Sequence, residues 1–278
     1  MTCKTILNEN KAYWTQRASG YSEVNQAELG TAQHEIWRGE LCRQIAAHFP
    51  DRAPEDLRVL DVGTGPGFFA ILLTESGFRV TAIDLTPEML SEARRNAGAI
   101  AEQIDFFEMN AEATTFPDGA FDVIVTRNLT WNLPHPEQAL REWARLLAPG
   151  GLLLNFDANW YGYLFDEDKR ADFDADRLNS AAQGVGDQNV GEKLRRHGGH
   201  RAAHSSLRHA APGVGSRRFH SAGTQRAGGR AGMGARLVAG GEDQFCLHAA
   251  VSGSGFKIRI IFSLQIKRSV LSYHGFRP

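Results

Sequence analysis

The sequence has few cysteines and no long apolar run. Its three cysteines, Cys3, Cys42 and Cys246, are far apart, odd in number and not at the spacing of metal ligands. They argue against a disulfide framework and favour free thiols in a reducing, cytoplasmic setting. No apolar stretch approaches the length of a membrane span, and the polar residues 1–5 do not resemble a secretory signal. We therefore expect a cytoplasmic protein with no membrane span and no metal site.

Acidic residues are missing from a long part of the second half. None lies between Glu192 and Glu242, where Arg, Gly, Ala and His dominate. Residues 195–278 hold fourteen Lys or Arg and two acids, a formal charge of +12, so the other residues carry −13 because the whole chain is −1. Either this region is a nucleic-acid-binding tail, or it is disordered or not a selected sequence, as a frameshift in a GC-rich gene would produce. Its scarcity of aromatic residues argues against nucleic acid as a partner.

Strands and helices alternate over the first half of the chain. Residues 1–50 are predicted to be helical, because Ile36, Leu41 and Ile45 recur at helical spacing before Pro50. Short apolar strands then alternate with helices, which predicts βαβ units and a parallel sheet of the Rossmann-like, doubly wound α/β type. The expected strands are Arg58–Val62, Arg79–Asp84, Ile104–Met109, Phe121–Thr126 and Leu152–Asp157. The expected helices are Phe68–Ser76, Pro87–Ala97 with Thr86 as N-cap, and Pro136–Leu147.

This pattern divides the chain into three parts. We predict a helical cap over residues 1–50, a cofactor-binding core over residues 51–190 and an anomalous tail over residues 191–278. No packed core is predicted between residues 195 and 240, since no hydrophobic period persists there. Residues 255–266 alternate like a strand, which is either a late strand of the sheet or an accidental pattern.

A glycine-rich turn follows the first expected strand. Gly63, Gly65 and Gly67 are spaced Gly-x-Gly-x-Gly, and Asp61 stands two residues ahead of them. Such a turn lets the backbone approach a ligand, and open α/β sheets bind ligands at the carboxyl ends of their strands. A dinucleotide-binding turn would read Gly-x-Gly-x-x-Gly, and two phenylalanines crowd the place where a pyrophosphate would lie. The turn therefore favours a nucleotide-like cofactor without a pyrophosphate, and Asp61 suits a cationic one.

An acid also ends the second expected strand. Asp84 lies about twenty residues beyond the first glycine, where a carboxylate can accept hydrogen bonds from both hydroxyls of a ribose. Asp84 therefore supports a cofactor built on adenosine. It does not by itself choose between NAD and S-adenosylmethionine (SAM).

Residues 59–157 resemble the class I SAM-dependent methyltransferases, in the broad group that includes the ubiquinone/menaquinone-biosynthesis type. The segments that carry the resemblance are Asp61–Gly67, Asp84–Leu90, Asn110–Glu112, Phe116–Asp122, Arg127–Leu133 and Leu147–Gly151. The resemblance implies SAM as the cofactor, a small-molecule methyl acceptor and the methyltransferase fold. It implies cofactor contacts from Asp61, Gly63, Thr64, Gly65, Gly67, Asp84, Leu85, Asn110, Ala111, Glu112, Arg127 and Asn128. The family commonly has Asp where Asn110 stands, and an amide oxygen can still accept from the adenine amine.

The resemblance extends to the segment from Tyr13-Trp14 to Tyr21. In the family this lead-in usually closes over the cofactor, with aromatic rings near the sulfonium, where a cation–π attraction would hold them. Ordinary helix packing explains the same aromatic residues equally well. The family sheet has seven strands, of which the last two help to build the acceptor pocket. Here they would fall in the anomalous tail, so we expect them to be missing or aberrant.

No catalytic residue can be assigned from the sequence. Methyl transfer from a sulfonium is an in-line displacement for which the protein mainly supplies alignment, and a weak nucleophile would also need a base. Asp157 and residues Asn159–Tyr161 follow the fifth expected strand, where they either line the acceptor pocket or are structural.

Three other functions stay open. An NAD-dependent oxidoreductase would need a Tyr-Lys or His-Asp set that is not seen in the sequence. The other two are a SAM-binding but inactive homologue and a nucleic-acid-binding protein that uses its basic tail.

Overall fold

The computed structural model of the chain describes the backbone of residues 3–157, 234–240, 244–250 and 259–262, and the side chains of residues 6–157. Its helices are α1 (Cys3–Leu29), α2 (Ala32–His48), α3 (Phe68–Glu75), α4 (Pro87–Ala97) and α5 (Pro136–Leu146), with short 3-10 turns at Pro54–Asp56, Gly98–Gln103 and Thr130–Asn132. Its strands are β1 (Arg58–Val62), β2 (Arg79–Asp84), β3 (Ile104–Glu108), β4 (Phe121–Arg127), β5 (Leu147–Phe156), β6 (Gly234–Gly240), β7 (Gln244–Ala250) and β8 (Arg259–Phe262). None of the helices in these ranges is both long and apolar enough to cross a membrane.

Six strands form one sheet in the order β3-β2-β1-β4-β5-β8, and every neighbouring pair is parallel. The chain starts in the middle of the sheet at β1, winds outward to β3 and then returns to continue at β4. This order confirms the predicted doubly wound α/β fold. It also places a switch point between β1 and β4, where the carboxyl ends of these strands leave a crevice for a ligand.

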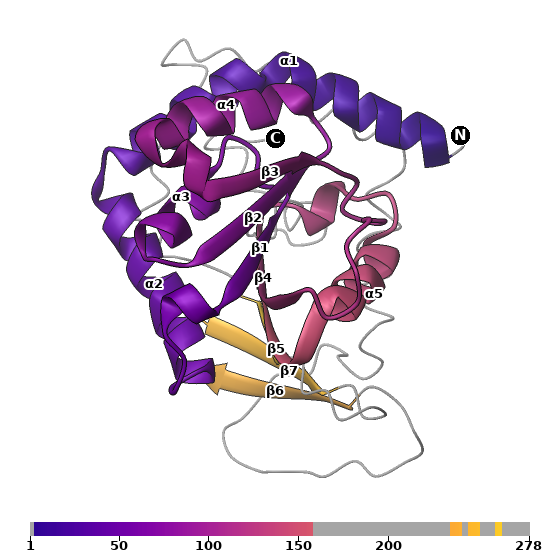
Figure 1. Cartoon of the computed structure of the whole chain (residues 1–278). Coiled ribbons are helices and arrows are strands. Elements are labelled where there is room, and N and C mark those ends of the chain that lie inside the picture. The colour runs from indigo at the N-terminus through magenta and orange to yellow at the C-terminus, as the bar shows by residue number, and fades with distance from the viewer. Residues whose placement is uncertain (1–2, 158–233, 241–243, 251–258, 263–278) are drawn as a thin grey trace, which may run out of the picture.

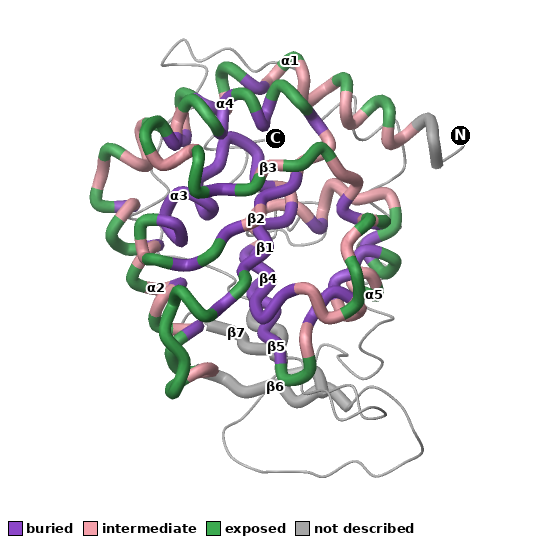
Figure 2. The backbone as a smooth tube through the Cα atoms, in the orientation of Figure 1, coloured by how far each residue is buried: buried purple, intermediate pink, exposed green. Residues whose placement is uncertain are grey.

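Apolar side chains cover both faces of the sheet, so its central strands are almost entirely buried (Figure 2). One buried cluster joins α2 and α3 to residues such as Val59 and Val125, and the other joins α5 to residues such as Leu60 and Ile124. Neighbouring residues of one strand thus point to opposite faces, as the two-residue period of a strand requires. Figure 1 shows α3 and α5 on opposite sides of the sheet and α1 lying along α4.

The N-terminal fifty residues form two helices that break at Gly30, and Thr31 caps the second by accepting from the N–H of Gln33. The buried stripe of α2 is Gln33, Trp37, Leu41 and Ile45. Our placing of Ile36 in this stripe was wrong, because its side chain is 43% exposed and the stripe runs one residue later. Since α2 packs into the same buried cluster as α3, the boundary predicted at residue 50 does not separate two cores.

The predicted strands and helices of the core are confirmed, with ends that differ by a residue or two in most cases. The exception is β5, which begins five residues early because Leu147 pairs with Phe121 before a bulge in the ladder. Thr86 does precede α4, but its side chain does not cap the helix. Instead the carboxylate of Asp84 accepts the backbone N–H of Thr86.

Two late segments of the chain also form strands. β6 pairs antiparallel with β7, although β6 lies in the stretch where we predicted no packed core. β8 falls within the alternating residues 255–266 and extends the sheet beside β5, which favours the late-strand interpretation. The other residues of the predicted tail, and Asn159–Tyr161, lie outside the described residues.

Candidate functional site

The glycine-rich bend joins β1 to α3 at the carboxyl edge of the sheet. All three of its glycines have positive φ, and that of Gly67 is +93°. A side chain on Gly67 would also meet the Cβ of Ala93 at 3.0 Å, so the absence of a side chain allows α3 and α4 to pack closely. The bend closes on itself through a hydrogen bond from the N–H of Gly67 to the carbonyl of Thr64 (3.0 Å).

Asp61 lies beneath the bend and is 2% exposed. Its carboxylate accepts the hydroxyl of Thr64 (2.7 Å) and the N–H of Ala70 in α3 (3.0 Å). Burial raises the pKa of Asp61 to about 7, although both hydrogen bonds oppose this shift. Asp61 therefore fastens the bend to α3.

Asp84 ends β2 directly beside the bend. Its two carboxylate oxygens accept the N–H of Gly65 (3.0 Å) and the N–H of Thr86 (2.9 Å). Burial raises its pKa from the ordinary value, while these backbone donors favour the charged form. The hydroxyl of Thr86 and the N–H of Leu85 also favour the charged form of Asp84. Asp84 is thus held in place by its neighbours as a hydrogen-bond acceptor at the wall of the cavity described next.

A small cavity of about 90 Å³ lies against the bend. Eight of the twelve predicted site residues line it, namely Gly63, Gly65, Asp84, Leu85, Asn110, Ala111, Arg127 and Asn128. The other four, Asp61, Thr64, Gly67 and Glu112, do not. The oxygen of Asn110 that we expected to face an adenine amine already accepts the N–H of Glu112 (3.0 Å), so a second lone pair would have to serve a ligand.

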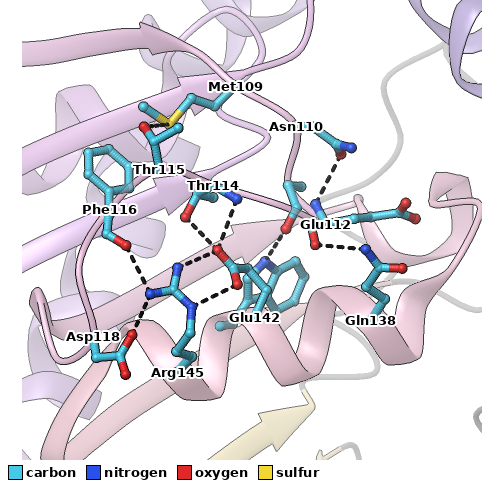
Figure 3. Close-up of polar contacts among 12 residues, drawn as sticks. Met109, Asn110, Glu112, Thr114, Thr115, Phe116, Asp118, Gln138, Glu142 and Arg145 are labelled. Carbon is cyan, nitrogen blue, oxygen red and sulfur yellow. Dashed lines mark hydrogen bonds and ion pairs between the residues drawn. The ribbon is translucent and has the colours of Figure 1, made fainter.

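The side chain of Glu112 points away from this cavity. It is 4% exposed and accepts the backbone N–H and the ring Nδ1 of His135, at the start of α5. Figure 3 shows that the segment around it is tied to α5 by further contacts, with Glu142 accepting from both Thr114 and Arg145. An open hollow of about 490 Å³ lies here, but most of its charged groups are already paired, so we regard it as structural.

The loop after β4 forms the roof of the small cavity. Asn128 adopts the left-handed conformation with φ +56°, which turns the chain back over the bend. The side chain of Leu129 then reaches Gly63 so closely that a Cβ on this glycine would lie 2.7 Å from it. Gly63 is therefore required both for its backbone angle and for the space above it.

Asp157 holds this roof in place. Its carboxylate accepts the N–H of Leu129 (2.8 Å), the N–H of Thr130 (3.0 Å) and the hydroxyl of Thr130. Burial raises its pKa to about 6 against these hydrogen bonds. These contacts favour the structural alternative for Asp157, and the described residues place no free base at the cavity.

One face of α1 closes the cavity from the other side. Its contributing residues recur at helical spacing, and they are Leu7, Asn10, Lys11, Trp14 and Tyr21. The ring of Trp14 lies 5.6 Å from that of Tyr21 and 6.4 Å from that of Trp131 in the roof. Sequence reasoning had singled out the aromatic residues but not the first three, although their spacing was a usable signal.

Arg127 and Glu28 form a further contact between α1 and the core that the sequence did not suggest. The guanidinium of Arg127 donates to both carboxylate oxygens of Glu28, at 3.0 and 2.7 Å. Both side chains are about 15% exposed. A cation and an acid from distant parts of the chain thus meet in the wall of the cavity.

Residues 60–155 match a family model described as a methyltransferase domain. The matched residues run from β1 to β5 and include the bend, Asp84 and Asn110, on a sheet with the order of a doubly wound fold. Residues 60–155 are thus similar to a methyltransferase domain. The part of the chain that the structure describes has no cluster of side chains that could hold a metal ion.

The chain is similar to several methyltransferases. Demethylmenaquinone methyltransferase of Thermus thermophilus is 42% identical over 106 residues, 37% of this chain and 47% of its own. The ubiquinone/menaquinone biosynthesis C-methyltransferase of Bartonella tribocorum is 31% identical over 159 residues, 54% and 59% of the two chains. The crystal structure of an arsenic(III) S-adenosylmethionine methyltransferase from Chlamydomonas reinhardtii matches with a TM-score of 0.33 and 31% identity, over 36% and 38% of the chains. The chain spans about half the length of the curated relatives it matches.

Proposed function

We propose that this chain binds SAM in the cavity beside the glycine bend and transfers a methyl group from it to a small-molecule acceptor. The observation that carries the proposal is the carboxylate of Asp84, which lines the cavity and lies 3.0 Å from the N–H of Gly65 in the glycine bend. An acid beside a bend without side chains fits a ribose and the chain attached to it. Neither feature provides for a pyrophosphate.

The residues present fit the cofactor at each of its parts. Asp84 would accept the ribose hydroxyls, and Asn110 and Ala111 would face the adenine from the loop after β3. Gly63 and Gly65 let the backbone approach the methionine part, above the negative charge of Asp61. SAM supplies a methyl group on a sulfonium that a nucleophile can displace.

The protein's own part in this reaction is to align the methyl donor with the acceptor and to exclude water. Trp14 and Tyr21 cover the bend from α1, and Leu129 covers it from the loop held by Asp157. An in-line displacement gains most of its acceleration from such positioning. Since the described residues offer no free base, we propose an acceptor that is nucleophilic without one, or one that loses its proton to water.

The acceptor we propose carries a flat ring. The aromatic side chains Trp14 and Tyr21 line the cavity, with Trp131 beside Trp14, and a flat ring can stack against such side chains. The two relatives named above carry the names of demethylmenaquinone and of ubiquinone/menaquinone biosynthesis, which supports an acceptor of quinone type.

Titration calorimetry with SAM on the full chain tests the cofactor. We expect saturable binding, and we expect Asp84→Asn to weaken it at least about tenfold, because hydrogen bonds to a charged acceptor contribute about 1.5–3 kcal/mol. Asp105→Asn is the matched control, since Asp105 is exposed on β3, and it should leave the affinity unchanged.

A parallel titration with NADH separates the rival enzyme class. An NAD-dependent oxidoreductase would bind NADH and not SAM, and that result would overturn the proposal. Failure of either ligand to bind would overturn it too. Full SAM affinity in Asp84→Asn would show that the cofactor lies elsewhere.

A further inference from the structure

Arg127 is a buried cation at the end of β4. Its side chain is 15% exposed, and its Cζ lies 4.7 Å from the ring centre of Phe68 and 4.9 Å from that of Trp37. The carboxylate of Glu28 holds both ends of its guanidinium fork. A cation so placed cannot lose its counter-ion without a large penalty, so it can leave Glu28 only for another anion.

The guanidinium fork of Arg127 selects the kind of anion. Its planar donors match a carboxylate or a phosphate, which each accept two parallel hydrogen bonds. Glu28 is a carboxylate, so a ligand carboxylate could take its place with the same geometry. SAM has no phosphate, but its methionine part ends in an α-carboxylate.

Arg127 also stands at a suitable place for that carboxylate. It lines the same cavity as Asp84, and the strands that carry these two residues, β4 and β2, flank β1 on either side. Two strand spacings amount to about 10 Å. This is of the order of the separation between the ribose hydroxyls and the α-carboxylate in an extended SAM, with Gly63 and Gly65 in between.

The cavity must enlarge before such a ligand can enter. Its volume of about 90 Å³ is well below the roughly 300 Å³ from which ligand pockets usually begin. Side chains of α1 form one wall of this cavity, and Glu28 belongs to this helix. The other ion pair between α1 and the core that the described residues form, Lys11–Glu108, has both partners more than a third exposed.

We propose that Arg127 exchanges Glu28 for the α-carboxylate of the bound donor, so that the Glu28–Arg127 ion pair is a latch between α1 and the core. The exchange keeps Arg127 neutralised throughout and releases α1 at the moment when the cofactor needs room. Glu28 is thus a competitor of the ligand, and α1 responds to the amino-acid end of the donor. The inference rests on the proposed function, because it requires SAM in this cavity.

Glu28→Gln in the full chain tests the latch. Gln keeps the shape of Glu28 but removes its charge, so the free protein holds Arg127 less well and the ligand carboxylate meets less competition. We expect the affinity for SAM, measured by titration calorimetry, to rise about tenfold, as one lost charge-assisted pair would give. The probe 5′-methylthioadenosine has no amino-acid group, and its affinity should change less than about twofold, within the scatter expected of a contact that is not made.

The control variant is Glu108→Gln, which breaks the exposed ion pair between Lys11 of α1 and Glu108 of β3 and should change the affinities for the two ligands equally. If Glu28→Gln unfolds, the double variant Glu28→Gln/Arg127→Gln removes both charges, and its preference for SAM over 5′-methylthioadenosine should fall below that of the wild type. An equal change for both ligands, or a loss of SAM affinity in Glu28→Gln, would overturn the latch while leaving the proposed function intact. Absence of SAM binding by the wild type would overturn both.

Discussion

The carboxylates at the two ends of the central strands accept hydrogen bonds from different kinds of donor. At the amino ends, Asp122 of β4 accepts from the guanidinium groups of Arg52 (2.8 Å) and Arg58 (2.9 Å). At the carboxyl ends, Asp61 and Asp84 accept from backbone N–H groups and threonine hydroxyls. In the first arrangement, the positive charges of two arginines neutralise the carboxylate. In the second, neutral donors hold the carboxylate in place without neutralising it.

This difference assigns separate tasks to the two edges of one sheet. A carboxylate that two arginines satisfy has its pKa lowered and stabilises the fold at neutral pH. A buried carboxylate without such partners has its pKa raised, so it weakens the fold when charged unless a ligand supplies the missing partner. Stability is thus concentrated at the amino edge, and ligand binding at the carboxyl edge, where open α/β sheets place their sites.

The largest effect is expected where Asp61 joins both tasks. Asp61→Ala leaves the buried N–H of Ala70 without an acceptor and frees the bend from α3. We expect urea unfolding to show a loss of about 3 kcal/mol, since an unsatisfied buried donor costs about 1–3 kcal/mol and a second hydrogen bond is lost with it. Asp105→Ala on exposed β3 should change stability by less than about 0.5 kcal/mol. If Asp61→Ala lowered the free energy of unfolding as little as Asp105→Ala, Asp61 would contribute to ligand binding and not to the stability of the fold.

A smaller effect, with a defined pH dependence, is expected at the amino edge. Burial alone would raise the pKa of Asp122, but hydrogen bonds from Arg58 and Arg52 outweigh it and lower the pKa to about 2. A lowered pKa stabilises the fold above the unfolded value near 4, and this contribution is lost as the pH falls from about 4 to 2. Asp122→Asn should therefore cost about 1 kcal/mol at pH 7, after discounting for the half-exposed arginines.

Urea unfolding of wild type and Asp122→Asn between pH 7 and pH 2 checks this sign. The difference between the two proteins should be constant down to about pH 5 and should close toward pH 2. A difference that stayed constant over the whole range would show that the arginines do not act on the charge of Asp122. The two edges would then not differ in the way described.

How far the sequence predicted this site depends on how local each contact is. The bend, β1 and α3 were predictable because the glycine spacing and the apolar run are adjacent in the chain, and Asp84 was predictable because it ends a strand just before Pro87. The Glu28–Arg127 pair joins residues 99 positions apart, and nothing in either neighbourhood indicates it. Contacts of this kind follow from the packing of α1, which the sequence pattern did not determine.

Two site residues show the same limit. The side chain of Glu112 lies next to predicted cofactor residues in the chain, yet it turns to His135 because α5 starts there and offers a backbone N–H. Asp157 follows the fifth expected strand, and its carboxylate accepts N–H groups of the loop after β4. The sequence indicates where both residues lie along the chain, but it does not indicate what their side chains contact.

The smallest expected effect tests whether a residue at the carboxyl edge of the sheet lowers the free energy of unfolding. Thr126 of β4 is fully buried, and its hydroxyl has no hydrogen-bond partner among the residues that the structure describes. Thr126→Val replaces this hydroxyl with a methyl group of similar size and should raise the free energy of unfolding by about 1 kcal/mol, because a buried polar group without a partner is unfavourable.

Thr74→Val is the matched control. The hydroxyl of Thr74 is also buried but donates to the carbonyl of Ala70 (2.8 Å), so this substitution should lower stability by about 0.5–1.5 kcal/mol. Opposite signs in urea unfolding would sharpen the contrast between the edges. An equal loss in both variants would mean that Thr126 is satisfied by a partner such as an ordered water, and the carboxyl edge would then be no less stable than the amino edge at this position.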